Sequence, residues 1–260
     1  MTPDPGHLAQ ARQVADAVLY EGYLLYPYRQ SAQKNRSRFQ FGVLMPPAYR
    51  AVDDCEPSAC QTECLAECAD DAEVEFQVRF LHFQRRTVQR IGPGEVTDVD
   101  TLWVNGVEHT SWDEAVERER SFRMPVADLL GKDTELLFPI GAGEEFEGLA
   151  GPGEEPAGRL ARRWEQLDVM IGVRADRVAG PYQALRLRVR VENRSEPTAP
   201  LRRRDDGLRY ALIAAHTLIA LPGPIRRSGC GCGWRTAASR GPRCAAATMG
   251  SATPLSRRIC

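Results

Sequence analysis

The residues best suited to chemistry are four of the eight cysteines, spaced C-x4-C-x3-C-x3-C: Cys55, Cys60, Cys64 and Cys68. Four thiolates can hold zinc or an iron–sulfur cluster. However, the spacing matches neither the paired C-x2-C of structural zinc sites nor the usual ferredoxin runs. Acidic neighbours such as Asp53, Asp54 and Glu63 also oppose thiolate formation by like-charge repulsion. Two alternatives stay open: a metal or redox centre, or thiols without a ligand in a variable loop.

A second candidate is the stretch YEGYLLYPYRQSAQKNR at residues 20–36, which holds four of the seven tyrosines and a basic, amide-rich end. Tyrosine and arginine are enriched at the energetic centres of protein interfaces. Tyrosines beside basic side chains also form stacking platforms for single-stranded nucleic acid, and they can pack a terminal helix onto a sheet. We take the stretch as a partner-binding surface, with packing as the alternative, through these residues: Tyr20, Tyr23, Tyr26, Tyr28, Arg29, Lys34, Asn35 and Arg36.

Motifs for catalysis or nucleotide binding are missing from the sequence, which has no G-x-S-x-G, P-loop, G-x-G-x-x-G or H-E-x-x-H. The glycine-rich segment from Gly141 is acidic and would repel phosphate. We interpret His82 as a packed or half-exposed histidine on the face of a strand rather than a metal ligand. These observations identify no catalytic residues and give no support to an enzymatic activity. They predict no cofactor beyond the zinc or iron–sulfur cluster of the cysteine alternative.

Charge divides the chain into two parts. Residues 1–225 carry all 35 acidic residues against 27 basic ones, whereas residues 226–260 carry seven arginines and no acidic residue. A nucleic-acid-binding domain is expected to be basic, so we expect no nucleic-acid partner. The composition of residues 226–260 predicts a basic, cysteine-rich disordered tail. This tail is either a functional basic or metal-binding segment or the product of a frameshift in a GC-rich gene.

The chain has no recognisable targeting or membrane segment. Its beginning lacks the basic and apolar regions of a signal peptide. The longest apolar stretch, from Tyr210, is interrupted by His216 and Pro222 and falls short of the roughly 18 residues of a membrane span. We therefore expect a cytoplasmic protein without membrane insertion, whose cysteines are reduced thiols or metal ligands.

Helical patterns occur at three places. Residues 7–25 predict a helix that Pro27 ends, with an apolar stripe that should face the core: Val14, Ala17, Val18 and Leu25. A serine and a glutamate with capping-box spacing predict either a helix over 111–122 or an irregular loop that returns to a strand. Residues 208–216 also have the composition of a helix.

Alternation of apolar and polar residues predicts strands at 38–46, 73–84, 167–173 and 185–192. Asn105-Gly106 predicts a type I′ hairpin, and the Gly-, Glu- and Pro-rich residues 141–158 predict a loop. Strands joined by turns rather than helices indicate a mainly β fold. We expect an antiparallel sandwich- or barrel-like body with an N-terminal helix, as a single domain over residues 1–225.

Six segments, in this order, carry a family resemblance: AVLYEGYLLYPYRQSAQKNRSRFQFGVLMP, QTECL, VRFLHFQRRTV, SWDEAVERE, GPYQALRLRVRVEN and LIAAHTL. Over residues 13–221 the chain resembles a family of bacterial, largely actinobacterial, proteins encoded beside the genes for nickel–iron hydrogenase subunits and maturation factors. In that family Cys64 looks typical, whereas the other three clustered cysteines look like local additions. The relatives continue past LIAAHTL with ordered sequence, and this chain instead enters its basic segment at about Pro222.

The resemblance implies an accessory protein that supports the assembly or maturation of a nickel–iron hydrogenase through protein–protein binding. Its partner would be a hydrogenase subunit or a maturation factor. The eight residues of the stretch 20–36 named above would form the docking surface. The alternative is a metal- or redox-active protein that uses the cluster Cys55, Cys60, Cys64 and Cys68.

Overall fold

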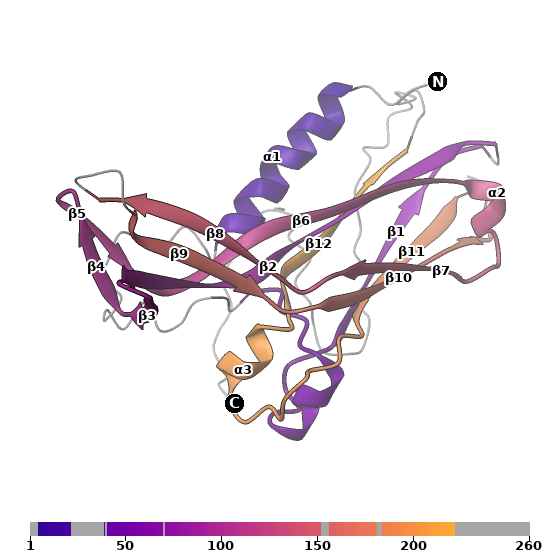
Figure 1. Cartoon of the computed structure of the whole chain (residues 1–260). Coiled ribbons are helices and arrows are strands. Elements are labelled where there is room, and N and C mark those ends of the chain that lie inside the picture. Colours follow the sequence, from indigo (N-terminus) through magenta and orange to yellow (C-terminus); the bar gives the residue numbers. More distant parts are fainter. Residues whose placement is uncertain are drawn as a thin grey trace, which may run out of the picture.

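The computed structural model describes residues 5–21, 39, 41–69, 71–151, 156–180 and 184–221. Within these residues the protein is mainly β, with antiparallel sheets and an N-terminal helix, which confirms the predicted fold class (Figure 1). No helix among the described residues is long and apolar enough to cross a membrane. The tail predicted at 226–260 lies outside the described residues.

The larger sheet is built on β2 (Glu73–Gly92), which is long enough to serve two parts of the molecule. β12 (Leu212–Ala220) and β6 (Trp112–Pro125) flank its first part. β9 (Pro156–Trp164) and β3 (Glu95–Val99) flank its last part, and β8 (Gly143–Ala150) extends the sheet from β9. All of these pairings are antiparallel.

The smaller sheet packs against the first part of β2 and makes the molecule a sandwich. Its strand order is β1 (Ala59–Ala66), β11 (Leu185–Asn193), β10 (Leu167–Arg177) and β7 (Thr134–Ile140), all antiparallel. Alternate side chains of β2, β10 and β11 meet between the sheets and are almost completely buried, among them Val74, Phe76, Val78, Phe80, Val169, Ile171, Leu187 and Val189. The two-residue period therefore produces the main core.

The last part of β2 has a core of its own, covered by the hairpin β4 (Thr101–Val104) and β5 (Val107–Thr110). This core contains Val88, Leu102, Val104, Leu149 and Leu160. Asn105 and Gly106 have φ values of 50° and 79°, so both turn residues are left-handed. A type I′ turn requires this conformation, and the predicted hairpin is confirmed.

Helical segments cover the other face of the larger sheet. α1 (Pro5–Glu21), the 3₁₀ helix η2 (Pro47–Ala51) and α3 (Arg204–Leu208) border a third cluster that includes Leu19, Tyr49, Leu81, Phe83 and Leu208. The short helix α2 (Val126–Leu129) joins β6 to β7 at one end of the sandwich (Figure 1). β2 therefore lies between two buried layers, and both of its faces are largely covered.

The helix predicted over 111–122 is wrong, because these residues belong to β6. β6 pairs with β2 from Trp112 to Pro125. Ser111 does not cap a helix: its hydroxyl accepts a hydrogen bond from Val88 N at 2.8 Å and donates one to Val99 O at 2.8 Å. Long-range pairing with β2 thus overrides the local capping signal, and the structure agrees with the alternative of a return to a strand.

Three further predictions differ from the structure. Of the predicted strand 38–46, the described residues 39 and 41–46 form bends and one isolated bridge from Leu44 to Leu212 instead, because Phe39 and Gly42 have left-handed φ values of 59° and 56°. The predicted loop 141–158 contains the strand β8, and the predicted helix 208–216 gives way to β12.

In contrast, the strands predicted at 73–84, 167–173 and 185–192 are confirmed, and each runs longer than predicted. Helix α1 is also confirmed, and the predicted residues 22–25 lie outside the described part.

Gly158 on β9 provides a test of the second core. A Cβ at this position would lie 2.6 Å from the carbonyl oxygen of Gln89 and would also press on Leu102. Gly158→Ala should therefore lower the free energy of unfolding by about 1–3 kcal/mol through overpacking. Gly148→Ala on neighbouring β8 is the matched control, because no atom lies within 4 Å of its added Cβ. Urea denaturation of both variants measures the difference, and equal stabilities would contradict the packing described here.

Candidate functional site

A buried ionic group lies where α1 crosses the larger sheet, around Arg79 of β2. Its side chain is 1% exposed. Arg79 Nη2 donates to Asp16 Oδ1 at 2.6 Å and to Glu117 Oε1 at 2.6 Å, while Nε donates to Glu117 Oε1 at 3.0 Å. Glu119 Oε2 lies 3.4 Å from Nε. Arg79 therefore joins α1, β2 and β6 through a single guanidinium.

Helix α1 contributes three polar residues at spacing four, so they share one face of the helix: Arg12, Asp16 and Tyr20. Arg12 Nη2 donates to Glu119 Oε2 at 2.7 Å. The Tyr20 hydroxyl donates to Glu117 Oε2 at 3.0 Å. We call these groups together the Arg79 cluster: Arg12, Asp16, Tyr20, Arg79, Glu117 and Glu119.

The orientation of α1 differs from the predicted one. The stripe expected to face the core contains Val14 and Ala17, but Val14 is 52% exposed and Ala17 is also exposed. Ala15 and Leu19 are buried instead. The helix turns its charged side toward the sheet because Arg79 requires carboxylate partners, and the uncharged residues Ala11, Gln13, Val14 and Ala17 consequently face outward.

Pairing shifts the pKa values inside the cluster. Burial by itself would lower the pKa of Arg79, but its hydrogen bonds to Glu117 and Asp16 raise it overall. Burial would raise the pKa of Glu117, but hydrogen bonds from Arg79 and Tyr20 lower it overall. Burial raises the pKa of Tyr20, and the hydrogen bond to Glu117 raises it further. Arg79 and Glu117 are therefore held in their charged forms, as an anchor for α1 requires.

Of the predicted partner-binding residues, Tyr20 falls in the described part of the chain. It is half-buried, packs against the cluster that contains Leu19, and holds Glu117. Tyr20 thus helps to pack α1 onto the sheet, and its role in partner binding stays a prediction. The other seven predicted residues lie outside the described part: Tyr23, Tyr26, Tyr28, Arg29, Lys34, Asn35 and Arg36.

The structure does not gather the four cysteines around one point. Cys60 and Cys64 lie on the inner face of β1, where four residues of strand separate them by about 13 Å. Cys68 follows the strand, and Cys55 is exposed in the loop before it. Burial raises the pKa of Cys64 to about 11. In this arrangement Cys60 and Cys64 cannot share one zinc ion, whose bonds to sulfur are about 2.3 Å long.

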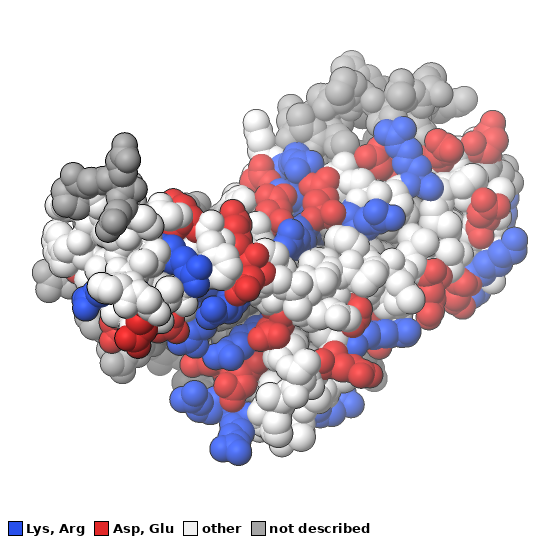
Figure 2. Space-filling model, in the orientation of Figure 1, with Lys and Arg blue, Asp and Glu red and all other residues white. Residues whose placement is uncertain are grey.

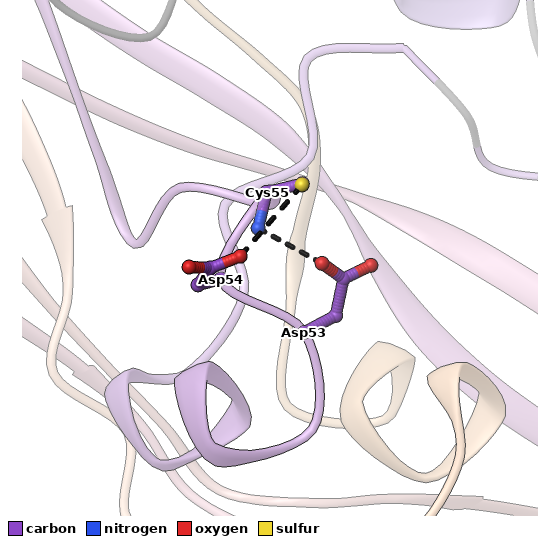
Figure 3. A group of neighbouring side chains, drawn as sticks. All are labelled: Asp53, Asp54 and Cys55. Carbon is purple, nitrogen blue, oxygen red and sulfur yellow. Dashed lines mark hydrogen bonds between the residues drawn. The ribbon is translucent and has the colours of Figure 1, made fainter. Parts of the chain in front are cut away.

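Among the described residues, the one group of side chains with ligand atoms within 4.8 Å of one another is Asp53, Asp54 and Cys55 (Figure 3). All three are exposed. Cys55 N donates a hydrogen bond to Asp53 Oδ1 at 2.9 Å. This hydrogen bond accounts for the close approach of residues 53 and 55 without a bound metal. The hydrogen bond with Asp53 and the charges of both aspartates raise the pKa of Cys55, so its thiolate is disfavoured. The donor set fits a cation poorly.

His82 is packed as predicted and is completely buried on the inner face of β2. Neither ring nitrogen has a hydrogen-bond partner of good geometry, although the backbone of Glu165 lies close enough to favour the protonated ring. Burial and the neighbouring charge of Arg118 nevertheless lower its pKa from 6.5 to about 4. His82 is therefore neutral at physiological pH.

Sequence patterns did not identify Arg79 as a site residue. Alternation along the strand places Arg79 on the same face as Glu75 and Gln77. Leu81 and Phe83 continue that same face, and both are almost completely buried. Two apolar residues on the polar face of a strand indicate that both faces are covered, and an arginine between covered faces needs carboxylate partners.

Comparisons with known proteins add no assignment to this geometry. The chain matches no protein-family model, and it matches no curated protein.

Replacement of Arg79 tests the cluster. Arg79→Met removes the charge that three carboxylates surround, so we expect a loss of about 3 kcal/mol in the free energy of unfolding. Arg123→Met is the matched control on the same sheet, because Arg123 is 54% exposed and pairs with Glu75 at 2.9 Å. That variant should lose less than about 1 kcal/mol. Equal losses, measured by urea denaturation, would show that Arg79 is no more important than a surface ion pair.

The pKa of His82 predicts a pH dependence. Because the folded-state pKa is lowered to about 4, the unfolded chain binds the proton first, and stability falls as pH drops from 6.5 toward 4. The full effect is on the order of 3 kcal/mol. His82→Phe removes the titrating group, so its stability should fall less than that of the wild type over this range. Parallel curves from denaturation at several pH values would contradict the buried, neutral state of His82.

Proposed function

We propose that the protein is a cytoplasmic accessory factor that binds a partner protein and supports the assembly or maturation of a nickel–iron hydrogenase. The family resemblance over residues 13–221 supports the hydrogenase connection. The partner in this proposal is a hydrogenase subunit or a maturation factor. The protein acts by binding, and no residue has a catalytic role.

The orientation of α1 is the observation that carries the binding part of the proposal. A surface helix normally turns its charged side to water and its apolar side to the core. In α1 the charged side chains of Arg12 and Asp16 pair with other members of the Arg79 cluster. Val14 is exposed, and Ala11 and Ala17 lie exposed on the same outer side of the helix. An exposed, uncharged helix face suits contact with another protein, because little desolvation of charge opposes association.

The position of α1 relative to the tyrosine-rich stretch also supports this proposal. α1 ends at Glu21, and Tyr20 is fixed to Glu117. The next residues of the chain are the tyrosines and arginines that the sequence assigns to docking. The docking surface we propose combines the outer face of α1 with the predicted residues that end it or follow it in the sequence: Tyr20, Tyr23, Tyr26, Tyr28, Arg29, Lys34, Asn35 and Arg36.

The alternative of a metal- or redox-active protein has less support. β1 places Cys60 and Cys64 about 13 Å apart, and burial disfavours the thiolate of Cys64. Metal analysis of protein purified without oxygen tests this alternative directly. Stoichiometric zinc or iron would favour it over the accessory role.

Hydrogen uptake by cells that lack the gene tests the proposed function. Uptake should fall, and the full chain should restore it. Val14→Lys places a charge on the outer face of α1 and should abolish most of the rescue, because the charge must be desolvated on binding. Val96→Lys on β3, where the side chain is 46% exposed, is the matched control and should restore uptake fully.

Three outcomes of this experiment would count against the proposal. Unchanged uptake in cells that lack the gene would remove the hydrogenase connection. Full rescue by Val14→Lys would remove α1 from the docking surface. Full rescue by the combined variant Tyr23→Ala, Tyr28→Ala and Arg36→Ala would remove the tyrosine-rich stretch from it.

A further inference from the structure

One long side of the sandwich is open between β6 and β7. These strands lie at neighbouring edges of the two sheets, are joined by α2, and pair only with β2 and β10 within the described part of the chain. The surface between them in Figure 2 is mostly uncharged. We call this side the β6–β7 seam.

Apolar side chains that belong to the core reach the surface at the seam. The inward residues of central β10, such as Val169 and Ile171, are 0% exposed. The inward residues of the seam pack on the same core but are only partly buried: Phe122, Met124, Leu136, Phe138 and Ile140. Phe122 stacks on Phe76 and Phe138 meets Phe80 edge-on, so both rings are held in place. The seam is therefore an apolar strip with a fixed shape.

Two arginines of β6 border this strip. Arg118 lies opposite Phe80, and Arg120 lies opposite Val78, so both belong to the inward face of the strand. Arg120 holds its guanidinium 5.9 Å from the centre of the Phe138 ring. Among the described residues, neither arginine has a carboxylate within ion-pairing distance, whereas Arg79, Arg123 and most other arginines of the two sheets have one. Within the described part of the chain, the positive charges of Arg118 and Arg120 are thus not compensated by an ion pair.

A buried nitrogen atom without an acceptor lies at the same place. Arg118 Nε is buried and has no hydrogen-bond partner among the described residues. An unsatisfied buried donor costs about 1–3 kcal/mol, so the guanidinium of Arg118 lacks an acceptor here.

We propose that the β6–β7 seam binds an anionic amphiphile, a long-chain carboxylate whose head group is held by Arg118 and Arg120 and whose tail covers Phe138 and its apolar neighbours. The carboxylate supplies an acceptor to Arg118 Nε and a negative charge to the two unpaired arginines. The tail removes the half-buried apolar side chains from water. This site is independent of the partner protein proposed above.

The edges of the seam argue against an acidic peptide as the occupant. A peptide would add to an edge as a new strand, through backbone hydrogen bonds. β6 carries charged side chains along most of its length and ends at Pro125, and β7 contains Pro139. Charges and prolines at an edge strand oppose strand addition. An alkyl chain needs no backbone hydrogen bonds and is not opposed in this way.

Calorimetric titration of the full chain with decanoate tests the proposal. Decanoate should bind, while decanol, which lacks the charge, should bind at least tenfold more weakly. Arg118→Gln should raise the Kd for decanoate about tenfold or more, the loss expected for one charged hydrogen bond. Arg85→Gln is the matched control, since Arg85 is exposed, lies on the opposite face of β2 and has no ion pair among the described residues; it should leave the Kd unchanged.

A second measurement avoids any dependence on the folding of Arg118→Gln. With decanoate labelled with carbon-13 at the carboxyl group, the bound carboxyl should titrate at lower pH than the free one, because Arg118 favours its charged form. No binding of decanoate to the wild type would overturn the proposal and leave buried water as the partner of Arg118. Equal binding of decanol would also overturn it. So would preferential binding of a synthetic peptide of alternating valine and glutamate, about six residues long.

Discussion

The burial of one arginine is the constraint on which the arrangement of the N-terminal half depends. Arg79 is 1% exposed and keeps its charge, because Glu117 of β6 and Asp16 of α1 hold its guanidinium at 2.6 Å. A charge in this position is tolerated only when it is paired. The sheet alone supplies Glu117 and Glu119, and α1 completes the cluster only with its charged side turned inward. The exposed face of α1 and the fixed position of Tyr20 both follow from this requirement.

The strands that the sequence predicted correctly have one face in the main core and a clear two-residue period. Residues 185–192 are an example, since Leu185, Leu187, Val189 and Val191 are buried and the arginines between them are not. The mistakes occur where that period is lost. β6 has few apolar residues because its charges serve Arg79 and Arg86, and its strand character comes from pairing with β2. β12 is irregular at Ala214, where φ is 52°. The irregularity breaks the two-residue period of the strand, so the sequence pattern of this segment resembles that of a helix.

The candidate site was less predictable than the fold, for a physical reason. The partners of Arg79 lie 63 and 38 residues away along the chain, and no local pattern connects Asp16 or Glu117 with Arg79. The stretch 20–36 drew attention because its tyrosines are close in sequence. Its first tyrosine turns out to support the same cluster. The cysteines show that closeness in sequence can also mislead. Cys60 and Cys64 are close in sequence, but the extended strand β1 holds them apart in space.

Hydrogen–deuterium exchange of α1 tests the central role of Arg79 most directly. Asp16→Asn keeps the size of the side chain and removes the charge that α1 brings to Arg79. If the ion pair positions the helix, the amides of α1 in this variant should exchange much faster than in the wild type, while those of β2 and β10 stay protected. Unchanged protection of α1 would contradict the account, because the helix would then keep its position without the charge that Asp16 brings to Arg79.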